Sequence, residues 1–338
     1  MTSRVSRLLA GSALGALVLA GPALADDPLT LRVTNIFPGA HFLWSEGGQV
    51  FADAVTQASG GAITFEAYHA GQLGNDQLAV LDSGLAEIGV IAAPYVADRM
   101  PLSGVVELPG IIENACDGAT RYWSMAQQGG LLDELEYAPL GLHALFVATP
   151  PPYKIMTTSA EVNTFADLAG LKLRTVGGAQ ADTVRALGGT PVQVQAPELY
   201  DSLSRGTVDG AIYAFVGMPP FSLGEVVHHS VEGAYAGSVA VLYAISTEVW
   251  EGLSADQQAM LTEAATMAQQ HVCEYQDAQE NAIRDQYVAE NGFSVTTLDE
   301  AAAAEFRAAM APVAEAWVGR MQDNNLRGAD VLAAYSAN

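Results

Sequence analysis

The sequence predicts an α/β protein with two units, each a mainly parallel sheet flanked by helices, and one long helix near the C-terminus. Strand and helix patterns alternate from residue 29 to residue 213, which is typical of parallel sheets with helical connections. The chain has 338 residues, which is longer than a domain with a single hydrophobic core usually is. A helical pattern without proline or glycine extends from residue 255 to residue 291. Together these observations favour two α/β units and a helix long enough to connect them.

The first unit opens with alternating residues at 29–35, which predict a strand. Two glycines, Gly60 and Gly61, end the helix that follows. Three prolines, Pro150 to Pro152, cannot donate hydrogen bonds to a sheet and mark the crossover to the second unit. The remaining patterns predict helices at 42–59, 75–83 and 114–128, and strands at 63–68, 87–92 and 142–148.

The second unit shows the same alternation from about residue 152 onward. It predicts helical segments at 164–169, 179–187 and 198–204, and strands at 171–176, 191–194 and 208–213. An apolar strand at 238–246 is expected to return to the first sheet. The helix at 255–291 would be about 55 Å long, enough to lie across both units. A strand at 293–298 and a final helix at 298–321 complete the prediction.

The first 25 residues have the pattern of a secretory signal peptide. Arg4 and Arg7 precede an apolar run of 14 residues, and Ala23-Leu24-Ala25 supplies small residues for cleavage. The run is too short to span a bilayer comfortably. We therefore expect export and cleavage near Ala25, with a retained membrane anchor as the alternative.

The charge of the exported chain limits its partners. Without Arg4 and Arg7, 12 Lys and Arg oppose 38 Asp and Glu, a net charge of −26. Such a chain lacks the basic surface that nucleic acids and anionic membranes require, although a small anion can still bind in a locally positive pocket. Export would permit a disulfide between Cys116 and Cys273, and two buried thiols are the alternative.

No catalytic pattern was found in the exported sequence. It contains no nucleophile elbow, no phosphate-binding loop and no glycine-rich dinucleotide motif. His228 and His229 form the only histidine pair, and adjacent side chains point in different directions, so we expect a solvated loop rather than a metal site. The sequence therefore predicts no enzyme, no metal and no cofactor.

Two cations, Lys172 and Arg174, share one face of the strand predicted at 171–176. Arg174 is nearer the carboxyl end of that strand, where open α/β sheets bind ligands. Gly177 and Gly178 then lead into a helix whose free N–H groups favour an anion. Because a guanidinium can bind a carboxylate with two hydrogen bonds, Arg174 is a candidate ligand residue, with pairing to a structural acid as the alternative. Lys172 is expected to line the approach or to pair with a surface acid.

The segment Phe165-Ala-Asp-Leu-Ala-Gly-Leu-Lys-Leu-Arg174 resembles the D-L-x-G-L-K-x-R segment of TRAP transporter solute-binding proteins of the DctP type. Further segments follow in the order of that family: Gly71-Gln-Leu-Gly74, Leu81-Asp-Ser-Gly84, Ala186-Leu-Gly-Gly-Thr-Pro-Val192, Glu198-Leu-Tyr-Asp-Ser-Leu203 and Gly206-Thr-Val-Asp-Gly210. The resemblance implies a monomeric periplasmic protein whose two domains close around a small organic acid and deliver it to membrane permease subunits. It also implies that Arg174 binds the carboxylate of the ligand.

With this resemblance, we predict domain I at 26–151 plus about 239–279, domain II at about 152–238 plus 280–338, and a ligand cleft between them. Two positions depart from the family pattern. Tyr213 stands where many members have asparagine, and Lys154 stands where many have a second arginine, although a one-residue shift would place Ile155 there. Tyr213, with Phe215 nearby, predicts a more aromatic pocket than a dicarboxylate site; ordinary core packing is the alternative.

Weaker ligand-binding candidates follow the ends of other strands. They are His41, Trp44, Gln72, Tyr95 and Gln193, and each could instead serve packing or a turn. Two other functions remain compatible with the sequence: a binding protein that feeds a sensor kinase, and an exported enzyme that acts on small acids.

Overall fold

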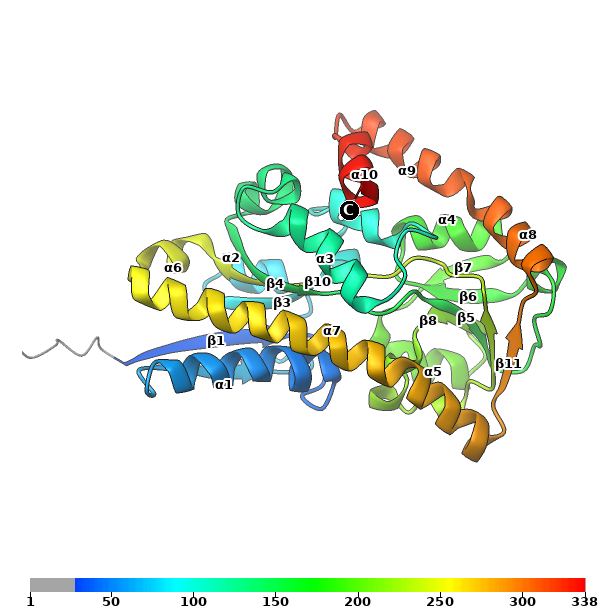
Figure 1. Ribbon diagram of the computed structural model, residues 1–338, viewed down its shortest axis with the longest axis horizontal. Coiled ribbons are helices and arrows are strands. Elements are labelled where there is room, and N and C mark those ends of the chain that lie inside the picture. Colours follow the sequence, from blue (N-terminus) through cyan, green and yellow to red (C-terminus); the bar gives the residue numbers. More distant parts are fainter. Residues whose placement is uncertain (1–27, 338) are drawn as a thin grey trace, which may run out of the picture.

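The computed structural model describes residues 28–337, so the predicted signal peptide lies outside the described residues. The chain forms two sheets flanked by helices, and helix α7 (Ala255–Asn291) runs past both of them (Figure 1). Among residues 28–337, no helix combines the length and apolar character needed to cross a membrane. The predicted α/β class with two sheets is confirmed.

The first sheet has the strand order β2-β1-β3-β10-β4. Strand β10 pairs antiparallel with β3 and β4, whereas β1 is parallel to β2 and β3. The apolar strand near residue 240 therefore returns to the first sheet, as predicted. The bounds are β1 (Leu29–Asn35), β2 (Ile63–Tyr68), β3 (Ile88–Ala92), β4 (Leu142–Ala148) and β10 (Val241–Ser246).

The second sheet has the order β11-β9-β5-β8-β6-β7. Only β5 among its strands runs against the others, because its pairings with β8 and β9 are antiparallel and the remaining pairings are parallel. Each sheet is thus mainly parallel and contains one reversed strand next to a crossover segment. The bounds are β5 (Lys154–Thr157), β6 (Lys172–Thr175), β7 (Thr190–Gln193), β8 (Gly210–Tyr213), β9 (His229–Glu232) and β11 (Ser294–Thr297).

Strands β5 and β9 were not predicted from the sequence. The solvated loop expected at the histidine pair is wrong for His229, which begins β9, is half-buried and hydrogen-bonds to Ser294 of β11. Both strands have only four residues, and each lies between two other strands. Neither the sequence of β5, Lys-Ile-Met-Thr, nor that of β9, His-Ser-Val-Glu, alternates apolar and polar residues, which is the pattern by which a strand is recognised.

The helices cover the faces of both sheets. They are α1 (Gln49–Ala58), α2 (Gln77–Asp82), α3 (Ala115–Ala126), α4 (Gly178–Ala186), α5 (Leu199–Ser204), α6 (Thr247–Gly252), α7, α8 (Glu300–Met310), α9 (Pro312–Asp323) and α10 (Gly328–Ala337). Short helical turns are η1 (Leu43–Gly48), η2 (Ala93–Val96), η3 (Leu102–Glu107), η4 (Asp133–Tyr137), η5 (Ala138–Leu140), η6 (Phe165–Leu168), η7 (Ala196–Glu198), η8 (Phe215–Gly217), η9 (Pro219–Phe221) and η10 (Leu223–Glu225).

The C-terminal region differs from the prediction of one final helix. Helix α8 ends at Met310 and α9 begins at Pro312. Proline lacks the N–H that a continuing helix would need and its ring clashes with the preceding turn, which accounts for the break. Helix α10 was not predicted; it packs against η3 and α3, while α9 packs against α4.

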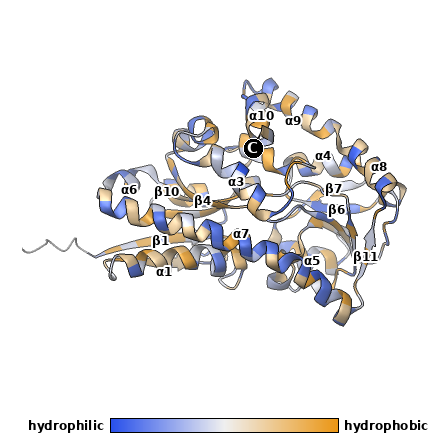
Figure 2. Ribbon diagram, in the orientation of Figure 1, coloured by the Kyte–Doolittle hydropathy of each residue, from blue (hydrophilic) through white to orange (hydrophobic). Residues whose placement is uncertain are grey.

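Helix α7 has the predicted bounds. Ser254 and Gln257 form a reciprocal capping box at its start, and Gly292, with φ +65°, ends it. Figure 2 shows hydrophilic and hydrophobic segments alternating along α7, in keeping with its partial burial against α1, α3, β4 and η8. It therefore contacts β4 of the first sheet and, on the other side, η8, the turn that follows β8 of the second sheet.

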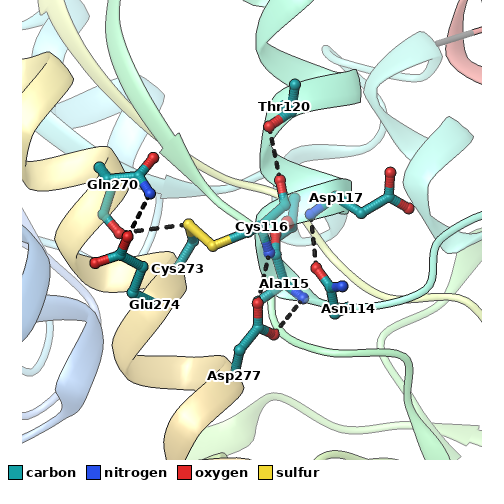
Figure 3. The surroundings of a disulfide bond; sticks show 10 residues. Asn114, Ala115, Cys116, Asp117, Thr120, Gln270, Cys273, Glu274 and Asp277 are labelled. Carbon is teal, nitrogen blue, oxygen red and sulfur yellow. Dashed lines mark hydrogen bonds between the residues drawn. A yellow bond between two sulfur atoms is a disulfide. The ribbon is translucent and has the colours of Figure 1, made fainter.

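A disulfide between Cys116 and Cys273 joins α3 to α7 (Figure 3). The alternative of two free thiols is therefore wrong. Asp277, one turn further along α7, accepts hydrogen bonds from the backbone N–H of Ala115 at 2.7 Å and of Cys116 at 3.2 Å. Together these contacts fix the start of α3 to the middle of α7.

Candidate functional site

A mainly apolar cavity lies between the two sheets. Its walls come from the ends of strands in both sheets and from the two segments that connect them. The first sheet and the turns after it contribute Phe37, His41, Phe42, Leu43, Ala92, Pro94, Tyr95 and Val241; the connecting segments contribute Pro150, Tyr153 and Val239; the second sheet and its turns contribute Arg174, Val176, Ala196, Tyr213, Ala214, Val216 and Gly217.

Among the described residues, Arg174 is the only Lys or Arg that lines this cavity, and it is 1% exposed. Its Nε donates to the carbonyl of Val194 at 2.8 Å, and Nη2 donates to the hydroxyl of Tyr95 at 3.4 Å. No carboxylate within residues 28–337 forms a salt bridge with it, so the expected alternative of a structural acid is not found there. A buried cation without a counter-ion is costly, and an anion that entered the cavity would relieve this cost.

The guanidinium of Arg174 lies over the ring of Tyr213, which in turn packs against Tyr153. It lies 5.4 Å from the ring centroid of Tyr213, whose ring is 5.6 Å from that of Tyr153. Burial raises the pKa of both phenols, so both stay neutral. Gly217 packs directly on Tyr213, because a Cβ at this glycine would come within 2.7 Å of the ring. The result is one cationic group set in an aromatic wall.

His41 lies at the cavity as a neutral side chain. It is 2% exposed, and burial lowers its pKa to about 3. Its Nδ1 accepts a hydrogen bond from the backbone N–H of Leu43 at 3.2 Å, which places the ring hydrogen on Nε2. His41 can therefore donate a hydrogen bond to a ligand but adds no second positive charge.

Tyr95 connects the two sides of the cavity. It belongs to η2, directly after β3 of the first sheet, and its hydroxyl accepts a hydrogen bond from the backbone N–H of Ala196 at 2.9 Å. The same hydroxyl is within reach of Arg174. Of the predicted ligand residues, the structure thus brings Arg174, Tyr213, His41 and Tyr95 together.

The other predicted ligand residues lie outside the cavity lining. The ammonium group of Lys154 is buried against the Oε1 atom of Glu280 at 2.6 Å. Trp44 is buried with its ring 4.7 Å from that of His69, and Phe215 packs on Phe293 with ring centroids 5.5 Å apart. Gln72 is exposed, and Gln193 donates to the carbonyl of Val176 at 3.2 Å.

Lys172 lies apart from Arg174, but the surface acid expected as its partner is not found among the salt bridges of the described residues. Its ammonium group donates to the carbonyl of Gly206 at 3.1 Å in an exposed position. The two cations of one short strand therefore have different surroundings, one at the surface and one in the cavity.

The N-terminus of α4 differs from the expectation that it would face a ligand anion. The carboxyl group of Glu107, at the end of η3, accepts a hydrogen bond from the N–H of Gln180 at 3.3 Å. Glu107 is 1% exposed, and burial raises its pKa to about 8 even though the helix amides and Arg320 lower it. Gly178, with φ +51°, leaves room for this carboxyl group. A protein side chain therefore occupies the place predicted for the ligand.

Sequence reasoning missed several cavity residues, including Phe37, Phe42, Tyr153 and Val216. These are apolar or aromatic residues of a kind that equally fills a core. Tyr153 follows the triple proline of the crossover, which was the one local signal of a connecting segment. The others are recognised only once the two sheets face each other.

Comparisons with known proteins agree with this arrangement. A family model described as bacterial extracellular solute-binding protein, family 7, matches residues 36–319. The C4-dicarboxylate-binding periplasmic protein DctP of Rhodobacter capsulatus is 26% identical over 272 residues, 78% of each chain. A TRAP solute-binding protein from Rhodoferax ferrireducens, solved with copurified benzoate, is 25% identical with a TM-score of 0.81, covering 91% of this chain and 97% of its own.

A marine metagenome TRAP solute-binding protein specific for aromatic acid ligands has the same fold. Its TM-score is 0.83 at 22% identity, and the match covers 91% of this chain and 98% of that one.

Proposed function

The chain is a member of bacterial extracellular solute-binding protein family 7, the family of TRAP transporter solute-binding proteins, and we propose that its ligand is a small monocarboxylate with an aromatic or apolar body. The observation that carries this proposal is the buried guanidinium of Arg174, which has no carboxylate partner in the described part of the chain. A ligand carboxylate would supply that partner and could accept two hydrogen bonds from it.

The rest of the cavity favours a ligand with a single charge. A second carboxylate would be buried among apolar and aromatic side chains, where His41 and the hydroxyls of Tyr153 and Tyr213 are neutral donors and the described residues supply no second cation. Lys154, which in an ungapped match to the family pattern stands where many members have a second arginine, is already paired with Glu280. The cost of burying an unpaired carboxylate disfavours dicarboxylates, and benzoate, the ligand of the Rhodoferax ferrireducens relative, has the charge and aromatic body that the cavity suits.

We propose that the ligand is captured by closure of two domains, divided at 26–151 plus about 239–279 and at about 152–238 plus 280–338. Helix α10 of the second domain would rest on the first. Because the cavity walls come from both sheets, a ligand would contact both domains only in the closed form and would therefore favour closure. Membership of the family further supports a periplasmic location and delivery of the ligand to TRAP permease subunits.

A thermal-shift screen of the exported chain tests this proposal. Benzoate, phenylacetate and mandelate are expected to raise the melting temperature, since a ligand at 100 times its dissociation constant adds about 2.7 kcal/mol to stability. Benzamide, which has the same ring without the charge, and succinate, which has two charges without a ring, serve as matched controls and should have little effect. Stabilisation by succinate alone, or by no carboxylate at all, would contradict the proposed ligand class.

A further inference from the structure

Glu280 of α7 is a buried carboxylate with three partners near the ligand cavity. It is 5% exposed. Its Oε1 atom accepts hydrogen bonds from the ammonium group of Lys154 at 2.6 Å and from the backbone N–H of Phe215 at 3.1 Å, and its Oε2 atom accepts from the backbone N–H of Val216 at 2.9 Å. A single side chain of the long helix therefore holds a cation of β5 and two amides of η8.

The turn η8 forms part of the cavity wall. Val216 and Gly217 line the cavity, and Gly217 packs on the ring of Tyr213, which faces Arg174. Glu280 does not line the cavity itself but binds the turn from behind. Displacement of η8 would move Val216 and Gly217 and would loosen the packing that orients Tyr213.

The face of α7 that carries Glu280 is also attached to α3, on the side of the first sheet. Cys273, Asp277 and Glu280 are spaced at i, i+4 and i+7, which places them on one face of the helix. Cys273 is bonded to α3 and Asp277 accepts from the N-terminal amides of α3. Within about two turns, α7 thus connects α3, on the side of the first sheet, to the cavity wall on the side of the second.

We propose that Glu280 is a positioning residue of the ligand site. It fixes η8 against the cavity, and it pairs with Lys154 so that this cation does not take part in ligand binding. The inference rests on the proposed function, because it assumes that the cavity beside Arg174 holds the ligand. It assigns to α7 a second role beyond bracing the two sheets, since α7 then sets the shape of the binding wall.

The test is the affinity of the variant Glu280→Gln for benzoate, measured by calorimetry. In this variant an NH₂ group replaces one carboxylate oxygen. At least one of the three donors to Glu280, which are the Lys154 ammonium group and the N–H groups of Phe215 and Val216, then loses its acceptor and faces the NH₂ group instead. Because η8 must then be re-ordered before benzoate can bind, the free energy of the lost hydrogen bond is subtracted from the binding free energy, and benzoate affinity is expected to fall at least about tenfold. The variant Asp277→Asn removes a capping carboxylate from the same helix face without touching η8, and its affinity should stay close to that of the wild type.

A double variant separates positioning from general stability. Glu280→Gln alone leaves Lys154 as an uncompensated buried charge, which should lower the melting temperature, whereas Lys154→Met with Glu280→Gln removes both charges and should restore it. The affinity of the double variant should remain low, because the amides of η8 still lack a carboxylate. If Glu280→Gln binds benzoate as tightly as the wild type, or if the double variant regains affinity together with stability, the inference is wrong. A wild type that binds no aromatic acid would overturn the proposed function and this inference with it.

Discussion

Replacement of Arg174 by methionine is expected to lower the affinity for benzoate by more than about a hundredfold, which corresponds to roughly 3 kcal/mol. The ligand carboxylate would lose its only cationic partner in the cavity and would be buried without one. The unliganded protein should keep its stability, because methionine fills most of the same space and removes a buried charge that has no counter-ion in residues 28–337. Calorimetric titration gives the affinity, and thermal unfolding without ligand gives the stability.

The matched control for this change is Lys172→Met. Lys172 lies on the same strand, two residues before Arg174, but its ammonium group contacts the carbonyl of Gly206 in an exposed position. This variant should bind benzoate like the wild type. Equal losses of affinity in the two variants would point to distortion of β6 instead of a lost ligand contact, and unchanged affinity in Arg174→Met would show that the carboxylate binds elsewhere.

Removal of the disulfide is expected to be the change with the largest effect on stability. The double variant Cys116→Ser and Cys273→Ser should lose about 2–5 kcal/mol of unfolding free energy, because the bond closes a loop between residues 157 positions apart and so restricts the unfolded chain. The hydrogen bonds from Ala115 and Cys116 to Asp277 would remain, so the native contact between α3 and α7 should persist.

Urea denaturation of the double variant measures this loss directly. The oxidised wild type serves as the reference, and the wild type unfolded in the presence of a reductant should match the double variant. A loss of less than about 1 kcal/mol would mean that the unfolded chain is already restricted in this region without the bond.

The elements predicted best from the sequence are those with a clear local pattern of residues. Helix α7 was predicted with its observed bounds because no proline or glycine interrupts residues 255–291, and the structure adds the caps that hold its ends, Ser254 with Gln257 at the start and Gly292 at the end. Strands β5 and β9 escaped prediction, since their sequences show no alternation of apolar and polar residues and only their neighbours in the sheet identify them as strands. The single helix predicted at 298–321 is instead divided into α8 and α9 at Pro312.

In the candidate site too, features set by nearby residues could be predicted, whereas contacts between residues distant in the sequence could not. Arg174 could be selected from its place near the end of a strand and from its family motif, and the structure places it in the cavity. The surroundings of Lys154 could not be foreseen, because its partner Glu280 is 126 positions away in the sequence. The same holds for Glu107, which lies 73 positions before Gln180 and occupies the helix N-terminus that was assigned to the ligand. The partner of a buried charge is set by the tertiary structure, which brings distant residues together. Short sequence motifs carry no information about such distant contacts.

The central claim is that Arg174 receives the carboxylate of an aromatic monoacid between the two sheets. A crystal structure of the exported chain with benzoate tests this most directly. The predicted result is a benzoate carboxylate within about 3 Å of the guanidinium nitrogens of Arg174, with its ring against Tyr213 and walls from both sheets closed around it. A benzoate bound elsewhere, or bound in this cavity with its carboxylate turned away from Arg174, would contradict the claim.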